Sequence, residues 1–330
     1  MTKHNTIKRN RGNRWSKVGI GKVGIGKTGI GKVAIGAVSI SIIAYSLGCA
    51  TIASQQRQWI FNPKNDMLTT PDQPPVHLDY ESVQIPVMPV GPTSTGSIPL
   101  SSSPSSSPKS LSEELQGWWI PASSDRPAVL VDEPYGITTS VNVILYLGGR
   151  GGNRSYHLPR IEGFHQLGFS VLMADYRGYG DSDYRQPSEA TVYQDAAAAW
   201  RYLTETRGIP PEQILIYGES LGGAIALELA LQQPDAGGLV MQSTFTSMTD
   251  VAHQVTFFRF FPIRSLITER FASLDKIGNL QVPLLLLHGT NDEVVPYEMS
   301  EVLYAAAPFP KDLFLIPEGS HFHIYRPGEL

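Results

Sequence analysis

One serine stands between two glycines in a pattern that is typical of a nucleophile in acyl transfer. The segment Gly218-Glu219-Ser220-Leu221-Gly222 follows the apolar run QILIY and precedes the helical pattern LGGAIALELALQQ. Small residues on both sides allow a tight turn from strand to helix, which raises the serine above the edge of a sheet. The pattern predicts attack by Ser220 on a carbonyl carbon, and a glycine-rich turn with a serine at the helix N-cap is the alternative.

This nucleophile needs a histidine that accepts its proton and an acid that orients the histidine. Where such a turn carries the nucleophile, the acid and then the histidine follow it along the chain. Asp292, in HGTNDEVVP, lies 72 residues after Ser220, and His321, in EGSHFH, lies 29 residues after Asp292. Both follow expected strands, so both fall at the carboxyl edge of the sheet, where Ser220 also lies. The sequence therefore predicts a Ser220–His321–Asp292 triad.

Neighbouring residues are alternatives for the acid and the base. Glu293 adjoins Asp292, but the turn TND at 290–292 favours the aspartate. His323 lies two residues beyond His321 and would point the other way in an extended segment, so we prefer His321, the first histidine after the strand. His288 ends an apolar strand and is interpreted as a buried, hydrogen-bonded residue. His157, His165 and His253 fall on helical patterns and are interpreted as ordinary helix residues.

Backbone N–H groups must stabilise the oxyanion that forms on the substrate. Leu221, directly after the nucleophile, is expected to supply one donor. The second should come from the loop after the strand expected at 141–147, where residues 148–153 read GGRGGN. Glycines let the backbone approach a substrate closely, whereas a generic glycine-rich turn is the alternative.

The sequence predicts neither a metal nor an organic cofactor. The pair His321 and His323 could be taken as metal ligands, but no third ligand lies near them in the sequence. Cys49 is the single cysteine, which excludes an internal disulfide framework and a cysteine-based metal site.

The elements that must position these residues alternate between short apolar runs and helical patterns. Such alternation is the signature of a parallel sheet, and continuous apolar strands indicate helices on both faces. The expected strands are 80–87, 115–121, 141–147, 169–175, 213–217, 238–242, 282–288 and 312–317. The expected helices are 158–167, 188–206, 221–233 and 297–307. The fold class predicted is α/β, with a doubly wound, mostly parallel sheet over residues 57–330.

Two stretches interrupt this pattern. Residues 91–110 hold 15 Ser, Pro or Gly among 20 and are expected to form a long loop between the first two strands. Residues 243–281 lie between two strands and are expected to form a short cap. Phe257, Phe258, Phe260 and Phe261 in this cap either line an acyl pocket or pack the cap onto the body.

The amino-terminal part differs sharply from the rest of the chain. Residues 1–32 carry nine Lys or Arg and no acid, as expected of a cytoplasmic tail. Residues 33–56 are 24 uncharged positions, about 36 Å as a helix, which is enough to cross a bilayer. An ordinary buried segment is one alternative. We expect either an uncleaved anchor or the signal segment of a lipoprotein, because SLGC at 46–49 is similar to a bacterial lipobox. Either outcome attaches the protein to a membrane, with its body on the extracytoplasmic side.

The body is acidic, since residues 33–330 carry 17 Lys or Arg against 30 Asp or Glu. Phosphate binding needs a basic face on the folded part, so this balance argues against nucleic acid as a partner. The sequence indicates no required protein partner. The expected partners are a small-molecule or lipid-like acyl substrate and the membrane.

The run from Gln58 to His321 resembles the α/β-hydrolase superfamily. Besides the GESLG turn, the matching segments are LYLGGRGGN at 145–153, DYRGYGDSD at 175–183, STFTSM at 243–248 and LLLHGTNDEVVPY at 285–297. More narrowly, the chain is similar to membrane-associated serine hydrolases that include mammalian protein depalmitoylases, serine aminopeptidase-like enzymes and bacterial relatives. The resemblance implies Ser220 as nucleophile, Asp292 as acid, His321 as base, and oxyanion donors on the backbone of Leu221 and Arg150.

The chain departs from the relatives at two places. They usually read His-Gly-Asn where residues 148–150 read GGR, so a differently ordered oxyanion loop is expected. They continue with a closing helix after the catalytic histidine, whereas nine residues follow His321 here, so that helix is expected to be missing. The expected function is hydrolysis of carboxylic esters or thioesters. The alternatives are an aminopeptidase-like amidase and a non-catalytic binding protein of the membrane surface on a hydrolase scaffold.

Overall fold

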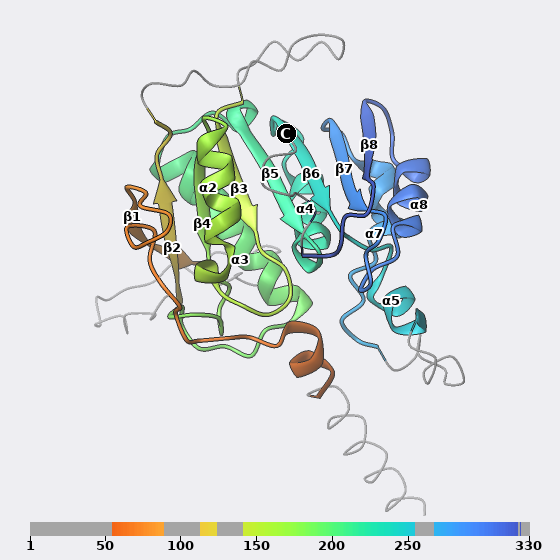
Figure 1. Cartoon of the computed structure of the whole chain (residues 1–330), viewed down its shortest axis with the longest axis horizontal. Helices are drawn as coiled ribbons and strands as arrows, with labels where there is room; N and C mark the ends of the chain where they lie inside the picture. Colours follow the sequence, from red (N-terminus) through yellow and green to blue (C-terminus); the bar gives the residue numbers. More distant parts are fainter. Residues whose placement is uncertain (1–54, 89–112, 124–140, 255–266, 323, 325–330) are drawn as a thin grey trace, which may run out of the picture. The chain divides into compact units, whose positions relative to one another are not determined.

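The computed structural model describes residues 55–88, 113–123, 141–254, 267–322 and 324. Its eight-stranded sheet has the order β1-β2-β4-β3-β5-β6-β7-β8 (Figure 1). The strands are β1 (Glu81–Val87), β2 (Glu113–Ile120), β3 (Val143–Leu147), β4 (Ser170–Ala174), β5 (Ile214–Glu219), β6 (Gly238–Gln242), β7 (Leu284–Gly289) and β8 (Lys311–Ile316). The pairs β1–β2 and β2–β4 are antiparallel and the other neighbours are parallel, which confirms the predicted mostly parallel sheet.

Helices cover both faces of this sheet. They are α2 (Leu158–Gln166), α3 (Glu189–Arg201), α4 (Leu221–Gln232), α5 (Met248–Gln254), α7 (Ser273–Lys276) and α8 (Glu298–Ala306). Side chains of α3, α4 and α8 share one apolar core with one face of the strands. Leu158 and Ile161 of α2 share a second core with the opposite face, as Figure 1 shows for α2 in front of the sheet. The predicted doubly wound arrangement is therefore confirmed.

Local sequence explains where the helices begin and end. Ser188 caps α3, because its side chain accepts from the Thr191 N–H and the Thr191 side chain bonds back to the cap. The predicted helix 188–206 ends its α-helical part at Arg201 and continues as one π-helical turn, Tyr202–Thr206. α4 is apolar all round because it lies inside the first core, with Ile225 and Leu227 fully buried.

Several predicted segments lie outside the described residues. These are the tail 1–32, positions 33–54 of the membrane segment, the loop 91–110, cap residues 255–266 and His323. Residues 55–61 are helical, and the two strands that flank the expected loop, β1 and β2, are antiparallel neighbours. Within the described ranges, no helix combines the length and the apolar character that crossing a bilayer needs.

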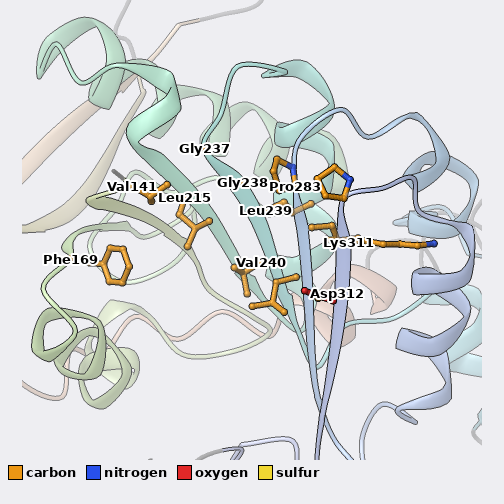
Figure 2. A pocket seen from close by; sticks show the side chains of 13 residues that line it. Val141, Phe169, Leu215, Gly237, Gly238, Leu239, Val240, Pro283, Lys311 and Asp312 are labelled. Carbon is orange, nitrogen blue, oxygen red and sulfur yellow. The ribbon is translucent and has the colours of Figure 1, made fainter. Parts of the chain in front are cut away.

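The amino ends of the strands surround an apolar cavity of about 250 Å³ (Figure 2). It is lined by the second residue of β5, Leu215, and by the first residues of β6, β7 and β8, which are Gly238, Leu284 and Lys311. The remaining lining residues are Val141, Phe169, Gly237, Leu239, Val240, Pro283, Leu285, Pro310 and Asp312. Because Ser220 follows the last residue of β5, this cavity and the serine lie at opposite ends of the strands.

Candidate active site

Ser220 occupies a strained turn between β5 and α4. Its φ of 54° and ψ of −117° lie in a region that side-chain-bearing residues rarely adopt. The flanking glycines make the turn possible: a Cβ on Gly218 would lie 2.2 Å from the Gly222 carbonyl oxygen, and one on Gly222 would lie 2.1 Å from the Leu147 oxygen. The backbone is also fixed, because the Ser220 N–H donates to the Gln242 carbonyl at 2.8 Å. The turn therefore holds the serine at the carboxyl edge of the sheet.

The structure brings Ser220, His321 and Asp292 together at this edge. His321 Nε2 lies 3.1 Å from Ser220 Oγ, and His321 Nδ1 lies 2.7 Å from Asp292 Oδ2. The His321 side chain is 4% exposed, and the Asp292 side chain is fully buried. An ionised carboxylate only accepts, so Nδ1 carries the proton, and Nε2 is free to accept from the serine hydroxyl. This arrangement can remove the proton from Ser220 as the serine attacks.

Asp292 accepts four hydrogen bonds that keep it ionised. Oδ1 accepts from the backbone N–H groups of Val294 and Val295, both at 2.8 Å. Oδ2 accepts from His321 and also from His288 Nε2, at 3.1 Å. Burial raises the pKa of Asp292, but the hydrogen bonds from His288, His321 and Val295 outweigh it and hold that pKa well below its usual range.

His288 is fully buried and hydrogen-bonded, as predicted, and it also contacts the candidate acid. Its Nε2 lies 3.0 Å from the Val295 carbonyl, which can only accept, so Nε2 carries a proton. Its Nδ1 lies within hydrogen-bond distance of Ser300 Oγ, at 2.6 Å. The contact with Asp292 was not anticipated, although its signal was the four-residue spacing of the two residues in HGTND. Glu293, the alternative acid, is exposed.

The glycine loop at 148–153 lies against the nucleophile. A Cβ on Gly149 would be 3.0 Å from the Glu219 oxygen and 3.2 Å from Ser220 Cβ. Gly151 and Gly152 adopt φ values of 68° and 77°, a region open to glycine. Among the described residues, the backbone hydrogen bonds of turns and loops include none from the Leu221 or the Arg150 N–H.

A buried polar network behind the nucleophile was missed by the sequence reasoning. The Tyr146 hydroxyl donates to Glu219 at 2.5 Å and so accepts from His157 Nδ1 at 2.8 Å. Arg160 Nε lies 3.1 Å from the same carboxylate. Burial raises the pKa of Glu219, but the charges of Arg160 and His157 outweigh it and lower that pKa. His157 is thus no ordinary helix residue, since it sits in a 3₁₀ turn over Tyr146.

No candidate metal centre was found among the described residues: no group of three or more His, Cys, Asp or Glu side chains there could hold an ion. The candidate site is thus built from Ser220, His321, Asp292 and the backbone around them.

Known proteins share this sequence and fold. A model of the prolyl oligopeptidase family matches residues 155–311. The uncharacterized protein Rv2307c of Mycobacterium tuberculosis is 37% identical over 209 residues, which cover 63% of this chain and 68% of that protein. The lysophosphatidylserine lipase ABHD12 of Danio rerio is 32% identical over 221 residues, which cover 60% of this chain and 56% of that protein.

A solved structure shows the same fold. The esterase Pf2001 of Pyrococcus furiosus matches with a TM-score of 0.54 at 19% identity, and the match covers 80% of this chain and 90% of the esterase chain. Sequence relatives and shared architecture agree with the resemblance that the motifs indicated. The chain therefore belongs to the α/β-hydrolase superfamily, as a serine hydrolase with a prolyl oligopeptidase family domain.

Proposed function

We propose that this protein hydrolyses carboxylic esters or thioesters through a covalent acyl-enzyme on Ser220. One observation carries the proposal: a single imidazole, that of His321, joins the Ser220 hydroxyl at 3.1 Å to the Asp292 carboxylate at 2.7 Å. This is the geometry in which a serine becomes a nucleophile at neutral pH.

In the first half-reaction, Ser220 Oγ forms a bond to the substrate carbonyl carbon while its proton passes to His321 Nε2. The carbonyl oxygen becomes an oxyanion, which the N–H groups of Leu221 and Arg150 stabilise. As the intermediate collapses, the bond from carbon to the alcohol oxygen or thiol sulfur breaks. His321 gives its proton to that leaving group, and Asp292 stabilises the imidazolium throughout.

In the second half-reaction, water replaces the alcohol or thiol. His321 accepts a proton from the water, whose oxygen attacks the acyl carbon. The bond between this carbon and Ser220 Oγ then breaks, and the proton returns to the serine. The products are a carboxylic acid and the regenerated enzyme, and the cycle uses no metal or organic cofactor.

Esters are favoured over amides by the names of the relatives. ABHD12 is named as a lysophosphatidylserine lipase and Pf2001 as an esterase, so a small or lipid-like acyl ester is the substrate class we propose. An aminopeptidase-like amidase is the second candidate, because the matching family is named for a peptidase. The same triad would serve both reactions. The non-catalytic binding protein is a third candidate that the hydrogen-bonded triad argues against.

Hydrolysis of p-nitrophenyl esters and acyl thioesters of increasing chain length tests the proposal. Wild type should turn over at least one series, and Ser220→Ala should lose at least about 10³-fold in kcat. Aminoacyl anilides in parallel separate the amidase from the esterase. Equal rates for wild type and Ser220→Ala on every substrate would refute the proposal and favour a binding protein.

We also propose that residues 33–56 attach the protein to a membrane, with the body on the extracytoplasmic side. The support is the uncharged stretch after nine bases. The protein should stay with membranes after alkaline carbonate extraction, and added protease should reach the body in spheroplasts but not in inverted vesicles. Full release by carbonate would contradict attachment. Loss of lipid labelling in Cys49→Ser would identify a lipoprotein.

A further inference from the structure

The loop that carries the Arg150 N–H is bonded to a segment far earlier in the chain. Arg150 Nε donates to the Trp59 carbonyl at 2.7 Å, across 91 residues of sequence. The backbone N–H of Gly151 donates to the Phe61 carbonyl at 2.9 Å. Two consecutive loop residues are therefore attached to two carbonyls of the segment 55–68, which we call the strap.

Further contacts join the loop to the strap, and they follow the residue order of both segments. Gly152 pairs with Pro63 in a parallel bridge. Next, Asn153 Nδ2 donates to the carbonyls of Lys64 and Asp66, at 3.1 and 3.0 Å. Strap and loop thus run side by side as a short parallel ladder, although neither belongs to the sheet.

The strap is itself fixed to the body. Phe61 is fully buried, and its ring packs on that of Phe271 with centroids 5.9 Å apart. Its carbonyl also accepts from the Tyr179 hydroxyl at 2.7 Å. Arg57 pairs with Glu269 at 2.6 Å. The glycine loop is therefore bonded to a segment that is itself anchored to the body by packing and hydrogen bonds.

A glycine-rich loop needs such a support if it is to act in catalysis. Gly151 and Gly152 have no side chains to pack, and a free glycine backbone samples many conformations. Oxyanion donors lower a barrier only when they are already aimed at the place where charge develops. Gly149 lies against Ser220, so any shift of the loop also moves the Arg150 N–H relative to the reacting carbonyl.

We infer that the strap, residues 55–68, is a positioning element of the active site. It holds the glycine loop, residues 148–153, in the conformation that aims the Arg150 N–H at the oxyanion. The inference rests on the proposed function and adds to it a set of residues that touch no substrate.

Asn153→Asp is the most selective variant. Asn153 Oδ1 caps the following turn by accepting from Ser155 N at 3.1 Å and Ser155 Oγ at 2.6 Å, and an aspartate keeps this acceptor. The Nδ2 donor is replaced by a carboxylate oxygen facing two carbonyls, so the strap contact is lost and becomes repulsive at this buried position. Arg150→Ala removes one further strap contact from an exposed side chain. Arg185→Ala is the matched control, because the exposed Arg185 makes a 2.9 Å bond from Nε to Glu113, outside strap and loop.

The readout is the ratio of kcat/KM for an ester to that for its thionoester, in which sulfur replaces the carbonyl oxygen. Sulfur accepts hydrogen bonds poorly, so its reaction depends little on oxyanion donors. A loss of oxyanion positioning lowers the ratio, whereas a general structural defect slows both substrates equally. We expect Asn153→Asp to lower the ratio about 10-fold and Arg150→Ala about 3-fold, mainly through kcat, with Arg185→Ala unchanged.

The outcomes separate this inference from the proposed function. Ser220-dependent hydrolysis with an unchanged ratio in a folded Asn153→Asp protein overturns the inference alone. Equal loss on both substrates also overturns it, because the strap would then only support the fold. If Asn153→Asp does not fold, the same ratio of kcat/KM values is compared between Arg150→Ala and Arg185→Ala. A ratio that is lower in Arg150→Ala supports the inference, and equal ratios overturn it. Hydrolysis that does not depend on Ser220 overturns the proposed function and the inference together.

Discussion

The two ends of the parallel strands hold very different environments. At the carboxyl ends, the buried side chains of His288, Asp292 and His321 are joined by hydrogen bonds of 2.7 to 3.1 Å beside Ser220. At the amino ends, an apolar cavity of about 250 Å³ lies among residues such as Val141, Phe169 and Leu215 (Figure 2).

In this sheet the apolar cavity and the candidate active site lie apart. The apolar cavity is lined mostly by aliphatic side chains and glycines, and its two charged residues, Lys311 and Asp312, come from the edge strand β8. The carboxyl edge instead concentrates backbone strain at Ser220 and the buried charge of Asp292, and this is the edge where chemistry is expected in open α/β sheets. Substitutions at the carboxyl edge should therefore affect rate, and those at the amino edge should affect stability.

The largest effect is expected for Asp292→Asn. The amide leaves the shape almost unchanged but offers an N–H₂ donor where His321 needs an acceptor, so the wrong tautomer is stabilised. We expect kcat to fall by about 10³- to 10⁴-fold with KM within a few-fold of wild type. Steady-state kinetics on the best ester measure this. A loss under 10-fold in a folded variant would mean that Asp292 is not the orienting acid.

A matched pair of glycine substitutions compares the two ends directly. In Gly222→Ala the new Cβ would lie 2.1 Å from a backbone oxygen, so the turn under Ser220 must shift. In Gly238→Ala the nearest atom, at 3.2 Å, is a methyl of Leu215 that borders the cavity and can move. We expect more than about 10²-fold loss of kcat for Gly222→Ala and nearly none for Gly238→Ala, from kinetics together with thermal melting. The reverse order would contradict the comparison.

A smaller effect is expected from His288. His288→Leu removes one of four donors to Asp292, whereas His288→Gln can still reach the carboxylate with an N–H. We expect the leucine variant to lose about 10-fold in kcat and the glutamine variant to recover most of it, since one hydrogen bond to a charged group is at stake. His165→Leu, on α2, is the control for losing a histidine. Equal kcat for the leucine variant and wild type would show that the His288 contact does not matter to the reaction.

The smallest effect on activity is expected for Val240→Ala. Val240 is 6% exposed and lines the amino-end cavity, so truncation enlarges a space that is already empty of side chains. We expect a loss of about 2 kcal/mol in the free energy of unfolding and no change in kcat. Denaturant unfolding and ester kinetics on the same sample measure both. A large change in kcat with little loss of stability would connect the cavity to the reaction.

The strands, helices and nucleophile turn could be predicted from sequence because their signals are local. GESLG lies directly between an apolar strand and a helix, and the observed strand ends fall within two residues of the expected ones. Asp292 and His321 could be brought to one edge by chain order alone, because parallel strands share the direction of their carboxyl ends.

The contacts that support the site could not be predicted, because they join residues distant in sequence. Asn153 reaches the strap across 87 and 89 residues, and Tyr146 reaches Glu219 across 73. No periodicity or motif specifies such pairs. His157 illustrates this point: its helical spacing was correct locally, but its partner lies on β3.

Labelling of the protein with a fluorophosphonate probe tests the central claim most directly. The probe reacts with a serine only when a base has activated it, and the adduct can be mapped by mass spectrometry. We predict a single adduct on Ser220 in the wild type, none in Ser220→Ala and a much slower reaction in His321→Ala. A folded wild-type protein that takes up no probe, or takes it up on another residue, would contradict the account.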